Sequence, residues 1–333
     1  MILVNQILKL FLLLLLTLFI SCSKNTLIID GNTMGTTYSI SVYNPSLSKK
    51  ELQNKIDSVL IDINSHFSTY IKDSEISKIN NVTDTNAILI SDKFKIVLNE
   101  ALFYCVLSNG SYDITIEHLV NMWGFGKDRL KEFPNINDIN IALDKTGYKK
   151  IILNDNFLIK KHPDIKLDLN SLAKGYAVDQ IYLLLETLGH TDFLVEIGGE
   201  LRSKGNNFYG NWLIGIQNPN NNSIIKKIKL NDYSMATSGT YNNYFEYEGV
   251  FYSHIINPIS GYPFEYQTAS VTILATNCMM ADAFATLCMT MPAKDALILI
   301  NSNDNVEGYI IEIDSDGRFI EYQSTMFDRY ITF

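Results

Sequence analysis

Hydrophobic and polar residues repeat along this chain with two different periods, which predict both helices and strands. The helical period is clearest at 48–67, where Leu52, Ile56 and further apolar residues share one face, and Ser48 with Glu51 forms a capping box. Further helices are predicted at 92–107, 171–188 and 278–291. Strands are predicted at 36–43, 193–197, 212–217 and 269–275, with a hairpin formed by 309–313 and 318–322. The strands come in runs, so the pattern predicts an α+β fold rather than a doubly wound one.

The N-terminal residues have the pattern of an export signal. Lys9 precedes an apolar run at 10–20, which is shorter than the roughly 20 residues needed to cross a bilayer but fits a signal-peptide core. Cys22 follows this run after one small residue, which is typical of a bacterial lipobox and predicts a lipid on its thiol. An ordinary export signal with an incidental cysteine is the alternative. The predicted organisation is a lipoprotein-type signal peptide at 1–21, a short tether at 22–30 and a single bilobal domain at 31–333.

Composition restricts the classes of function. With 47% hydrophobic and 19% charged residues, the chain can bury a sizeable core, which excludes disorder as its main state. The net charge of -9 argues against a nucleic-acid partner. Cys278 and Cys288 would lie ~15 Å apart on one helix, beyond disulfide reach. We therefore expect these two cysteines and Cys105 to be buried thiols.

The segment 168–177 places a carboxylate, a hydroxyl and a lysine at the start of a helix with an apolar interior. The unpaired N–H groups of a helix N-terminus, together with Lys174, would form an anion site, and Asp168 could accept hydrogen bonds from a base or a ribose. In the alternative interpretation, Asp168 caps the helix and Lys174 is a solvated charge. The residues alone leave both interpretations open.

Asp282 and Thr286 are four residues apart on a predicted helix that is otherwise apolar, so they share one face. An acid on such a helix is either paired or bound to a cation. Oxygen ligands with few carboxylates suit Mg²⁺, which keeps waters and substrate phosphates in its shell. The alternative is a buried acid that accepts hydrogen bonds from the backbone.

His254 lies on a predicted strand that runs into a tight turn, and it could act as a general base. A single histidine on a strand is more often structural, and the sequence alone does not separate these roles. The chain has neither a GxGxxG motif after a strand nor a GxxxxGK[ST] motif, so the common nucleotide-binding folds have no support.

Nine short motifs, taken in chain order, carry a resemblance to a known family. They are Met34-Gly35-Thr36; Phe67-Ser68-Thr69-Tyr70 with Asp73-Ser74-Glu75-Ile76; Tyr112-Asp113; Trp123-Gly124-Phe125-Gly126; Asp168-Leu169 with Ala173-Lys174-Gly175-Tyr176-Ala177; Ile197-Gly198-Gly199-Glu200; Ala236-Thr237-Ser238-Gly239; Ser253-His254-Ile255-Ile256; and Ala281-Asp282-Ala283 with Ala285-Thr286. This order resembles the ApbE family of FAD:protein FMN transferases. The resemblance covers nearly the whole chain after the signal peptide.

The resemblance implies a fold of duplicated sheet-and-helix units with FAD in the cleft between the two halves. The residues that would line FAD are Met34, Tyr70, Ser111, Tyr112, Asp113, Asp168, Lys174 and Ile256. The residues that would hold Mg²⁺ are Ser171, Asp282, the backbone of Ala285, and Thr286. Both sets agree with the anion site and the cation site expected from the residues alone.

The implied activity is the Mg²⁺-dependent transfer of FMN from FAD to a Thr or Ser hydroxyl of a target protein, with release of AMP. Asp282 would act through the metal, and His254 would relay the acceptor proton. Acceptor subunits of membrane redox complexes that carry covalent FMN would be the partners, which suits a membrane-anchored lipoprotein on the periplasmic side. An FAD pyrophosphatase and a flavin-binding lipoprotein without turnover are the alternatives.

Four positions depart from the family pattern. Asn170-Ser171 replaces small residues that are often Gly-Gly, although a serine still offers a backbone carbonyl to a metal. Glu196 replaces a frequent Asn, Asn257 a usual Asp, and Glu117-His118 a common Gly-Pro. We expect these three changes to affect fine positioning and to remove no ligand.

Overall fold

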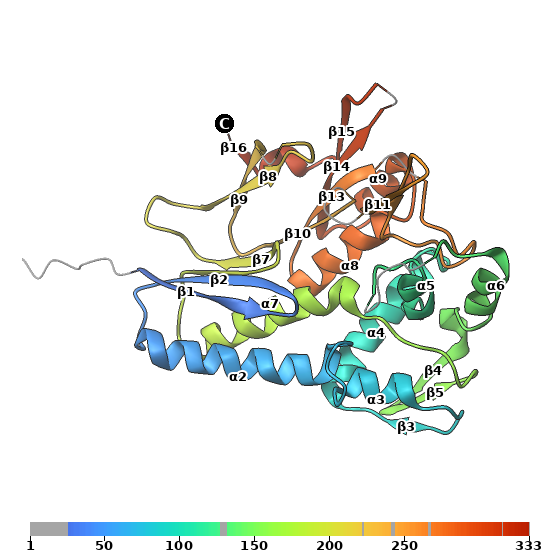
Figure 1. Cartoon of the computed structure of the whole chain (residues 1–333). Coiled ribbons are helices and arrows are strands. Elements are labelled where there is room, and N and C mark those ends of the chain that lie inside the picture. Colours follow the sequence, from blue (N-terminus) through green and yellow to red (C-terminus); the bar gives the residue numbers. More distant parts are fainter. Residues whose placement is uncertain are drawn as a thin grey trace, which may run out of the picture.

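One antiparallel sheet of eight strands organises the chain (Figure 1). The computed structural model describes residues 26–126, 132–221, 223–240, 244–265, 268–314 and 316–332. The predicted signal peptide and Cys22 lie outside these residues. The strands follow one another in the sheet in the order β1 (Thr26–Thr33), β2 (Thr36–Tyr43), β6 (Phe193–Ile197), β7 (Glu200–Lys204), β10 (Ser234–Gly239), β13 (Thr268–Ala275), β14 (Val306–Ile313) and β15 (Phe319–Gln323).

The two halves of this sheet repeat one arrangement. In the first half, α7 (Asn170–Thr187) lies in sequence between the antiparallel pairs β1–β2 and β6–β7. In the second half, α8 (Cys278–Cys288) lies between the pairs β10–β13 and β14–β15. Strands β7 and β10 join the halves edge to edge. The predicted α+β fold with duplicated sheet-and-helix units is confirmed.

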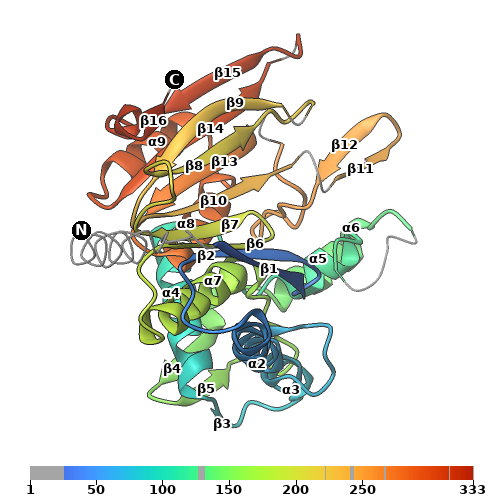
Figure 2. The same ribbon diagram turned by 90° about the vertical axis from the view of Figure 1, so that its left-hand side faces the viewer.

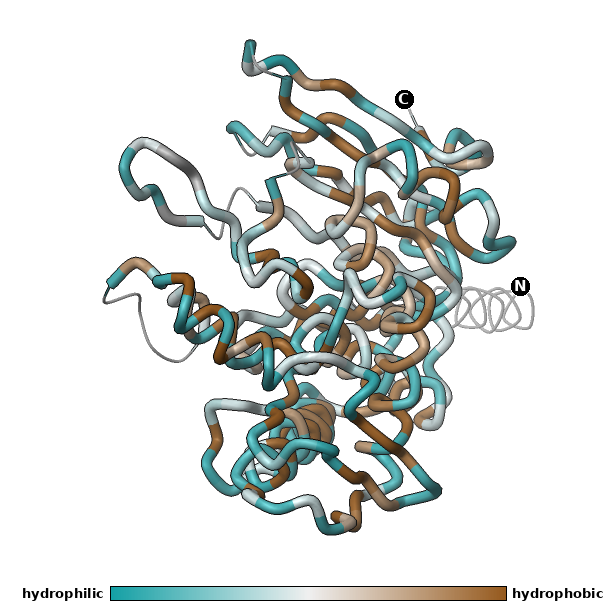
Figure 3. The backbone as a smooth tube through the Cα atoms, turned by 90° about the vertical axis from the view of Figure 1, so that its right-hand side faces the viewer, coloured by the Kyte–Doolittle hydropathy of each residue, from teal (hydrophilic) through white to brown (hydrophobic). Residues whose placement is uncertain are grey.

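Other elements pack against both faces of the sheet, so the central strands are buried on both sides. Helices α2 (Lys49–Phe67), α4 (Asp92–Leu107), α7 and α8 enclose the main core on one face. Strands β8 (Trp212–Gln217), β9 (Ile224–Leu230) and β16 (Ile331–Thr332) form a small sheet over the other face. All eight residues of β13 are buried for this reason. Figure 3 shows apolar residues gathered where helices and sheet meet.

The remaining elements lie around this framework. Two of them, β11 and β12, form a separate hairpin that projects from the molecule in Figure 2. Their bounds are α3 (Glu75–Asn81), α5 (Glu117–Met122), α6 (Ile136–Asp144), α9 (Ala293–Asn301), β3 (Ile88–Leu89), β4 (Ile151–Asn154), β5 (Phe157–Lys160), β11 (Tyr244–Tyr247), β12 (Val250–Ser253), and the short 3₁₀ turns η1 (Tyr148–Lys150) and η2 (Phe327–Arg329).

The predicted elements are present, and their boundaries shift by one residue or less apart from α8, the tether and β14, which begins at Val306, three residues earlier than predicted. The capping box at Ser48 is formed, and α4 has the predicted bounds. Helix α8 ends at Cys288, three residues earlier than predicted, because Pro292 already caps the next helix, α9. The segment 26–30, assigned to the tether, belongs to β1, which pairs with β2 along its whole length. Strand β1 therefore includes the last five residues of the predicted tether.

Two further observations concern the cysteines and the helices. Cys105, Cys278 and Cys288 are buried and free, as expected. Across the described ranges, no helix is long and apolar enough to cross a membrane.

Candidate active site

The site is built where α7 and α8 pack side by side (Figure 1). The N–H of Gly175 donates to Asp282 Oδ2 at 2.9 Å, and one turn later Asp179 accepts the N–H groups of Cys278 and Met279, both at 2.9 Å. A Cβ on Gly175 would lie 2.3 Å from the carbonyl oxygen of Cys278, so this contact requires glycine. These contacts make the helices antiparallel. The same register places the start of α7, at Ser171, opposite the last turns of α8.

A lysine and two buried carboxylates lie at the centre of this helix contact. Lys174 Nζ is 2.7 Å from Glu200 Oε1 and 3.6 Å from Asp282 Oδ1. The two carboxylate side chains are 4% and 3% exposed, and that of Lys174 is 28% exposed. One ammonium therefore faces two carboxylates, which leaves the cluster with an excess of negative charge when all three are ionised. Lys174 is paired within the protein, so it is not the solvated charge of the alternative interpretation.

The pKa values follow from this burial and pairing. Burial raises the pKa of Asp282 above its ordinary value and that of Glu200 to about 8, although Lys174 acts in the opposite direction on both. Burial opposes the charge on Lys174, but the two carboxylates outweigh it and raise the pKa of its ammonium. A bound cation would relieve the same excess of negative charge.

Oxygen atoms from both helices gather next to Asp282. Thr286 Oγ1 shares a hydrogen bond with Ser238 Oγ at 3.2 Å, and Ser171 Oγ shares one with Tyr112 OH at 2.6 Å. Ala285 is buried, but its carbonyl shares the N–H of Met289 with the Thr286 carbonyl, at 3.3 Å and 3.1 Å. Such weakly bonded carbonyls form the negative end of α8. The residues predicted to hold Mg²⁺ thus offer a mixed set of carboxylate, hydroxyl and carbonyl oxygens, which suits a hard cation.

The loop that carries Ser111 and Tyr112 reaches this end of the helix pair. Ser111 Oγ shares a hydrogen bond with Thr290 Oγ1 at 2.8 Å, just beyond α8. The N–H of Asp168 donates to the Ile114 carbonyl at 2.7 Å, which joins two motifs that are far apart in sequence. Asp168 Oδ1 also accepts the N–H of Asn170 at 2.8 Å. The structure therefore brings Ser111, Tyr112, Asp168 and Ser171 together at the start of α7.

Asp113 lies in this loop, but both oxygens of its carboxylate accept hydrogen bonds from other residues of the protein. Oδ1 accepts the N–H and the hydroxyl of Thr115 at 2.8 Å and 2.6 Å, and Oδ2 accepts the N–H of Tyr148 at 2.7 Å. Burial raises the pKa of this carboxyl group, against these hydrogen bonds. Asp113 therefore fixes the shape of the loop that presents Tyr112.

Three other residues predicted to line a ligand belong to elements other than α7 and α8. Met34 has a φ of 50° in the turn between β1 and β2, where it helps to line a shallow hollow. Tyr70 follows α2 and is 71% exposed, so its ring is available for stacking. Ile256 is 3% exposed and packs in a small core with Leu119 and Trp123. A ligand could contact Ile256 only through its backbone, because its side chain is enclosed.

His254 lies in an aromatic region rather than in the charged cluster. Strand β12 ends at Ser253, so His254 follows the strand instead of lying in it as predicted. Its ring is half-buried and meets the Phe125 ring edge to face, with centroids 6.2 Å apart. The tight turn that follows is present, closed by the Gly261 N–H donating to the Asn257 carbonyl at 2.8 Å. His254 therefore has the accessibility that a proton carrier needs.

Three of the departures from the family pattern have structural partners. Glu196 Oε1 accepts the N–H of Gly199 at 2.7 Å, and Glu117 Oε2 accepts from the Asn80 amide at 2.7 Å. Asn257 Oδ1 accepts the N–H of Ile259 at 2.8 Å, which an aspartate would do equally well. Glu196 on β6 thus holds the turn to β7 and Asn257 holds its own turn, while Glu117 joins the start of α5 to α3.

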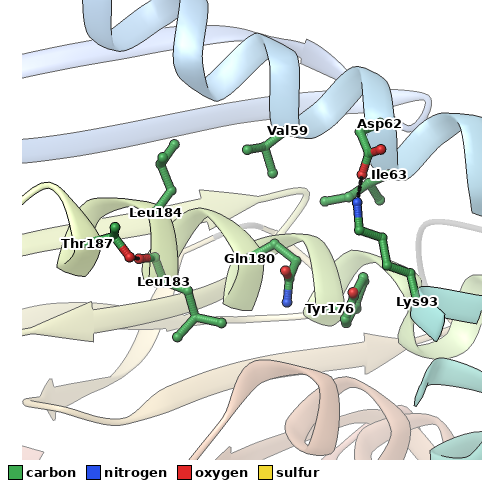
Figure 4. Close-up of a pocket in the computed structure, with 9 residues that line it drawn as sticks. All are labelled: Val59, Asp62, Ile63, Lys93, Tyr176, Gln180, Leu183, Leu184 and Thr187. Atoms are coloured by element: carbon green, nitrogen blue, oxygen red, sulfur yellow. Dashed lines mark hydrogen bonds and ion pairs between the residues drawn. The ribbon is translucent and has the colours of Figure 1, made fainter.

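A hollow of about 250 Å³ lies elsewhere, between α2 and α7 (Figure 4). Asp62 and Lys93 form an ion pair at one end of it, and Leu183 and Leu184 line the other. None of the residues predicted for the active site lines this hollow. It is therefore separate from the candidate chemistry.

Sequence reasoning missed two partners in the site. Glu200 and Ser238 appear in the motifs, but neither received a role, because only the packing of β7 and β10 against the helices brings them to Lys174 and Thr286. Their presence in the family motifs was the one feature of the sequence that could have indicated a role. Within the part of the chain that the structure describes, no three His, Cys, Asp or Glu residues cluster as a metal site would. A metal here would depend on neutral oxygens beside Asp282.

Comparison with known proteins places this geometry in a family. The sequence profile of the ApbE family matches residues 34–310, which include every element of the site. The chain belongs to the ApbE family. The Vibrio cholerae protein named FAD:protein FMN transferase is 38% identical over 310 residues, covering 91% of this chain and 92% of that protein. The Haemophilus influenzae protein of the same name is 36% identical over 324 residues, covering 93% of both.

Solved structures of ApbE proteins have the same fold. The flavin transferase ApbE from Vibrio cholerae matches with a TM-score of 0.86 and 36% identity, covering 92% of this chain and 99% of that one. The ApbE protein from Thermotoga maritima matches with a TM-score of 0.83 and 27% identity, covering 93% of this chain and all of that one, at 100%. The duplicated sheet and the helix pair are therefore features that this chain shares with its family.

Proposed function

We propose that this protein is a Mg²⁺-dependent FAD:protein FMN transferase, which moves FMN from FAD to a Thr or Ser hydroxyl of a target protein and releases AMP. The observation that carries the proposal is that the positive end of helix α7 lies beside the negative end of helix α8. The start of α7 carries the positive end of that helix dipole, and beside it the last turns of α8 offer Thr286 Oγ1 and the Ala285 carbonyl to a cation, one turn from Asp282. A pyrophosphate with a bound metal ion needs both.

Each residue then has a defined part. Asp282, Thr286, the Ala285 carbonyl and Ser171 would hold Mg²⁺, which supplies charge stabilisation at the pyrophosphate when bound. Tyr112 orients Ser171 through their hydrogen bond, and Ser238 orients Thr286. Asp168, Ser111 and the exposed ring of Tyr70 would contact other parts of FAD. Asp113 acts indirectly, by holding the loop of Tyr112.

The proposed chemistry balances as a phosphoryl transfer. The acceptor hydroxyl oxygen forms a bond to the phosphorus of the FMN half, and the bond from that phosphorus to the bridging oxygen breaks. The electron pair of the broken bond leaves with AMP. His254 takes the proton of the acceptor hydroxyl, in the role of general base. Positioning and charge stabilisation are what the protein contributes to such a reaction.

The test of this function is the fate of FMN. The protein, FAD, Mg²⁺ and a candidate acceptor domain are incubated together, and the intact mass of the acceptor is measured. Transfer predicts an acceptor heavier by one FMN, with an equal amount of AMP. Free FMN with an unmodified acceptor would instead identify an FAD pyrophosphatase, in which water replaces the hydroxyl. Bound FAD without AMP would identify a flavin-binding lipoprotein without turnover.

The location is a separate part of the proposal. We infer an exported lipoprotein, anchored through Cys22 and facing the periplasm, where acceptor subunits of membrane redox complexes would be its partners. The support is the apolar run at 10–20 with Cys22 just after it. Replacing Cys22→Ser should give unprocessed or soluble protein with unchanged catalysis. Absence of lipid label on the wild-type protein, after growth with a palmitate analogue, would contradict the anchor.

A further inference from the structure

Glu200 has no assigned role, yet it holds the lysine that lies nearest to the proposed metal ligand. Its carboxylate is buried at the start of β7, and Oε1 is 2.7 Å from Lys174 Nζ. Its other oxygen, Oε2, is buried without a hydrogen-bond partner among the described residues. Among the described residues, Lys174 is therefore the one charged partner that holds this carboxylate in place.

Lys174 is shared unequally between two carboxylates. It lies 0.9 Å nearer to Glu200 than to Asp282, from the distances of 2.7 Å and 3.6 Å. Asp282 Oδ2 is already engaged with the Gly175 N–H, so Oδ1 is the oxygen that a cation would take. The ammonium of Lys174 is the competing cation for that oxygen. A shift of about 1 Å toward Asp282 would shorten this 3.6 Å ion pair to hydrogen-bond distance, where a charged pair is strongest.

We propose that Glu200 is a positioning residue that holds Lys174 away from Asp282 and so keeps Oδ1 available to the metal. This inference rests on the proposed function, because it assumes that Asp282 is a metal ligand. Lys174 then serves as a counter-charge that stabilises two buried carboxylates while the metal is absent. With Glu200 in place, the metal does not have to displace the ammonium from a close pair.

Double-mutant analysis of Mg²⁺ binding tests this role. Binding is measured by calorimetry on the full-length protein in detergent, at about pH 8.5 so that Glu200 is ionised, both alone and with ADP as a source of pyrophosphate. The variants are Glu200→Gln, Lys174→Met and their combination. Glu200→Gln keeps the size of the side chain but loses its charge, so Lys174 should close onto Asp282 and weaken Mg²⁺ binding about tenfold. Lys174→Met removes the competitor and should tighten binding by a similar factor.

The chain offers a matched control. Lys204 on β7 pairs with Glu186 on α7, so the same two residue types join the same two elements with their places exchanged. Glu186→Gln should leave Mg²⁺ binding unchanged. Far-ultraviolet circular dichroism and the melting temperature of each variant without metal establish that it is folded. If Lys174→Met does not fold, Lys174→Gln, which keeps a donor for Glu200, takes its place in the cycle.

The decisive comparison is the effect of Glu200→Gln with and without Lys174. If Glu200 acts by positioning Lys174, the tenfold loss should shrink to about twofold or less in the Lys174→Met background. An equal loss in both backgrounds would overturn the inference, because Glu200 would then act on the metal directly. Absence of Mg²⁺ binding by the wild type, with and without ADP, would overturn the metal site itself. The two failures are therefore distinguishable.

Discussion

Two lysines in this molecule are held in different ways, and the contrast separates a supporting region from a chemical one. Lys160, on β5, is fully buried, and its ammonium donates to the carbonyls of Ile79, Val82 and Ile165 at 3.2 Å, 2.6 Å and 3.2 Å. Lys174 is partly exposed and faces two carboxylates. Three neutral carbonyls accept from the ammonium of Lys160, which leaves it no free N–H donor for a ligand. The second belongs to a cluster with unbalanced charge.

The pKa values of the two lysines move in opposite directions. Burial lowers the pKa of Lys160, whereas the carboxylates raise that of Lys174. Lys160 ties the end of α3 to the segment before Asp168, and Asn80 adds two hydrogen bonds to the backbone of Leu167, at 2.7 Å and 2.8 Å. This region therefore supports the approach to α7. Changes there should lower stability, and changes near α7 and α8 should alter the rate or the metal affinity.

Apart from the loss of Asp282, the largest expected effect lies at His254, which belongs to neither lysine region. His254→Ala should slow FMN transfer by about 10² to 10⁴, the range for a lost general base, with little change in FAD affinity or melting temperature. Transfer rates and FAD dissociation constants of both proteins provide the measurement. Equal losses of binding and rate would make His254 a structural residue.

At Lys160 the expected effect is on stability. Lys160→Met leaves three buried carbonyls without their donor and should lower the free energy of unfolding by about 3 kcal/mol, since an unsatisfied buried group costs roughly 1 to 3 kcal/mol. Denaturant unfolding measures this change. The transfer rate of the folded variant should stay within about threefold of wild type, as expected of a structural change away from the site. A variant with unchanged stability and a strongly reduced transfer rate would contradict the assignment of Lys160 to a supporting region.

Thr286→Val should have a smaller effect, confined to the metal. Valine keeps the shape of the side chain but loses the hydroxyl, so the Mg²⁺ concentration for half-maximal AMP release should rise about 10-fold to 100-fold, as for other lost supporting contacts of a metal site. Folding should be unaffected, because the hydroxyl is only half-buried and its partner Ser238 is half-buried too. An unchanged Mg²⁺ dependence would remove Thr286 from the ligand set.

The smallest expected effect is a change in pH dependence. The pKa of Glu200 rises from 4.5 to about 8 on burial, so the folded protein holds more protons than the unfolded chain between these values. Its contribution to the free energy of unfolding therefore falls as the pH rises from about 4.5 to about 8. Glu200→Gln should flatten this decline. Denaturation at about pH 5, 6.5 and 8 with a chelator would show it, and parallel curves for the two proteins would refute it.

Local signals explain how much of the fold could be predicted. The bounds of helix α4 follow from its apolar face and from Asn109-Gly110, both with positive φ, which ends it; the structure adds Ser91 as the cap of its start. Strand β1 was assigned to a tether because its short apolar stretch has no pattern of its own. It becomes a strand only by pairing with β2. Local sequence does not contain that pairing.

The residues of the site also divide into those that local sequence predicts and those that depend on tertiary packing. Asp282, Thr286 and Ser171 were predicted from helix spacing and motif resemblance, and the structure places their two helices in contact. Glu200 could not be assigned, because its role depends on β7 packing against α7. The structure also restricts two predicted ligand contacts, since the carboxylate of Asp113 and the side chain of Ile256 are occupied by the protein itself. Such occupancy follows from tertiary packing, which residue type alone does not reveal.

The central claim is that Asp282 holds a metal ion that is required for FAD cleavage. A Mg²⁺ titration of AMP release, with wild type and Asp282→Asn side by side, tests it most directly. Asparagine keeps the size and one oxygen of the side chain, so the variant should fold, but it removes the one formal negative charge on α8. The account predicts a saturable curve for the wild type and almost no AMP from the variant at any Mg²⁺ concentration. Superimposable curves would contradict it and leave Asp282 as a paired buried acid.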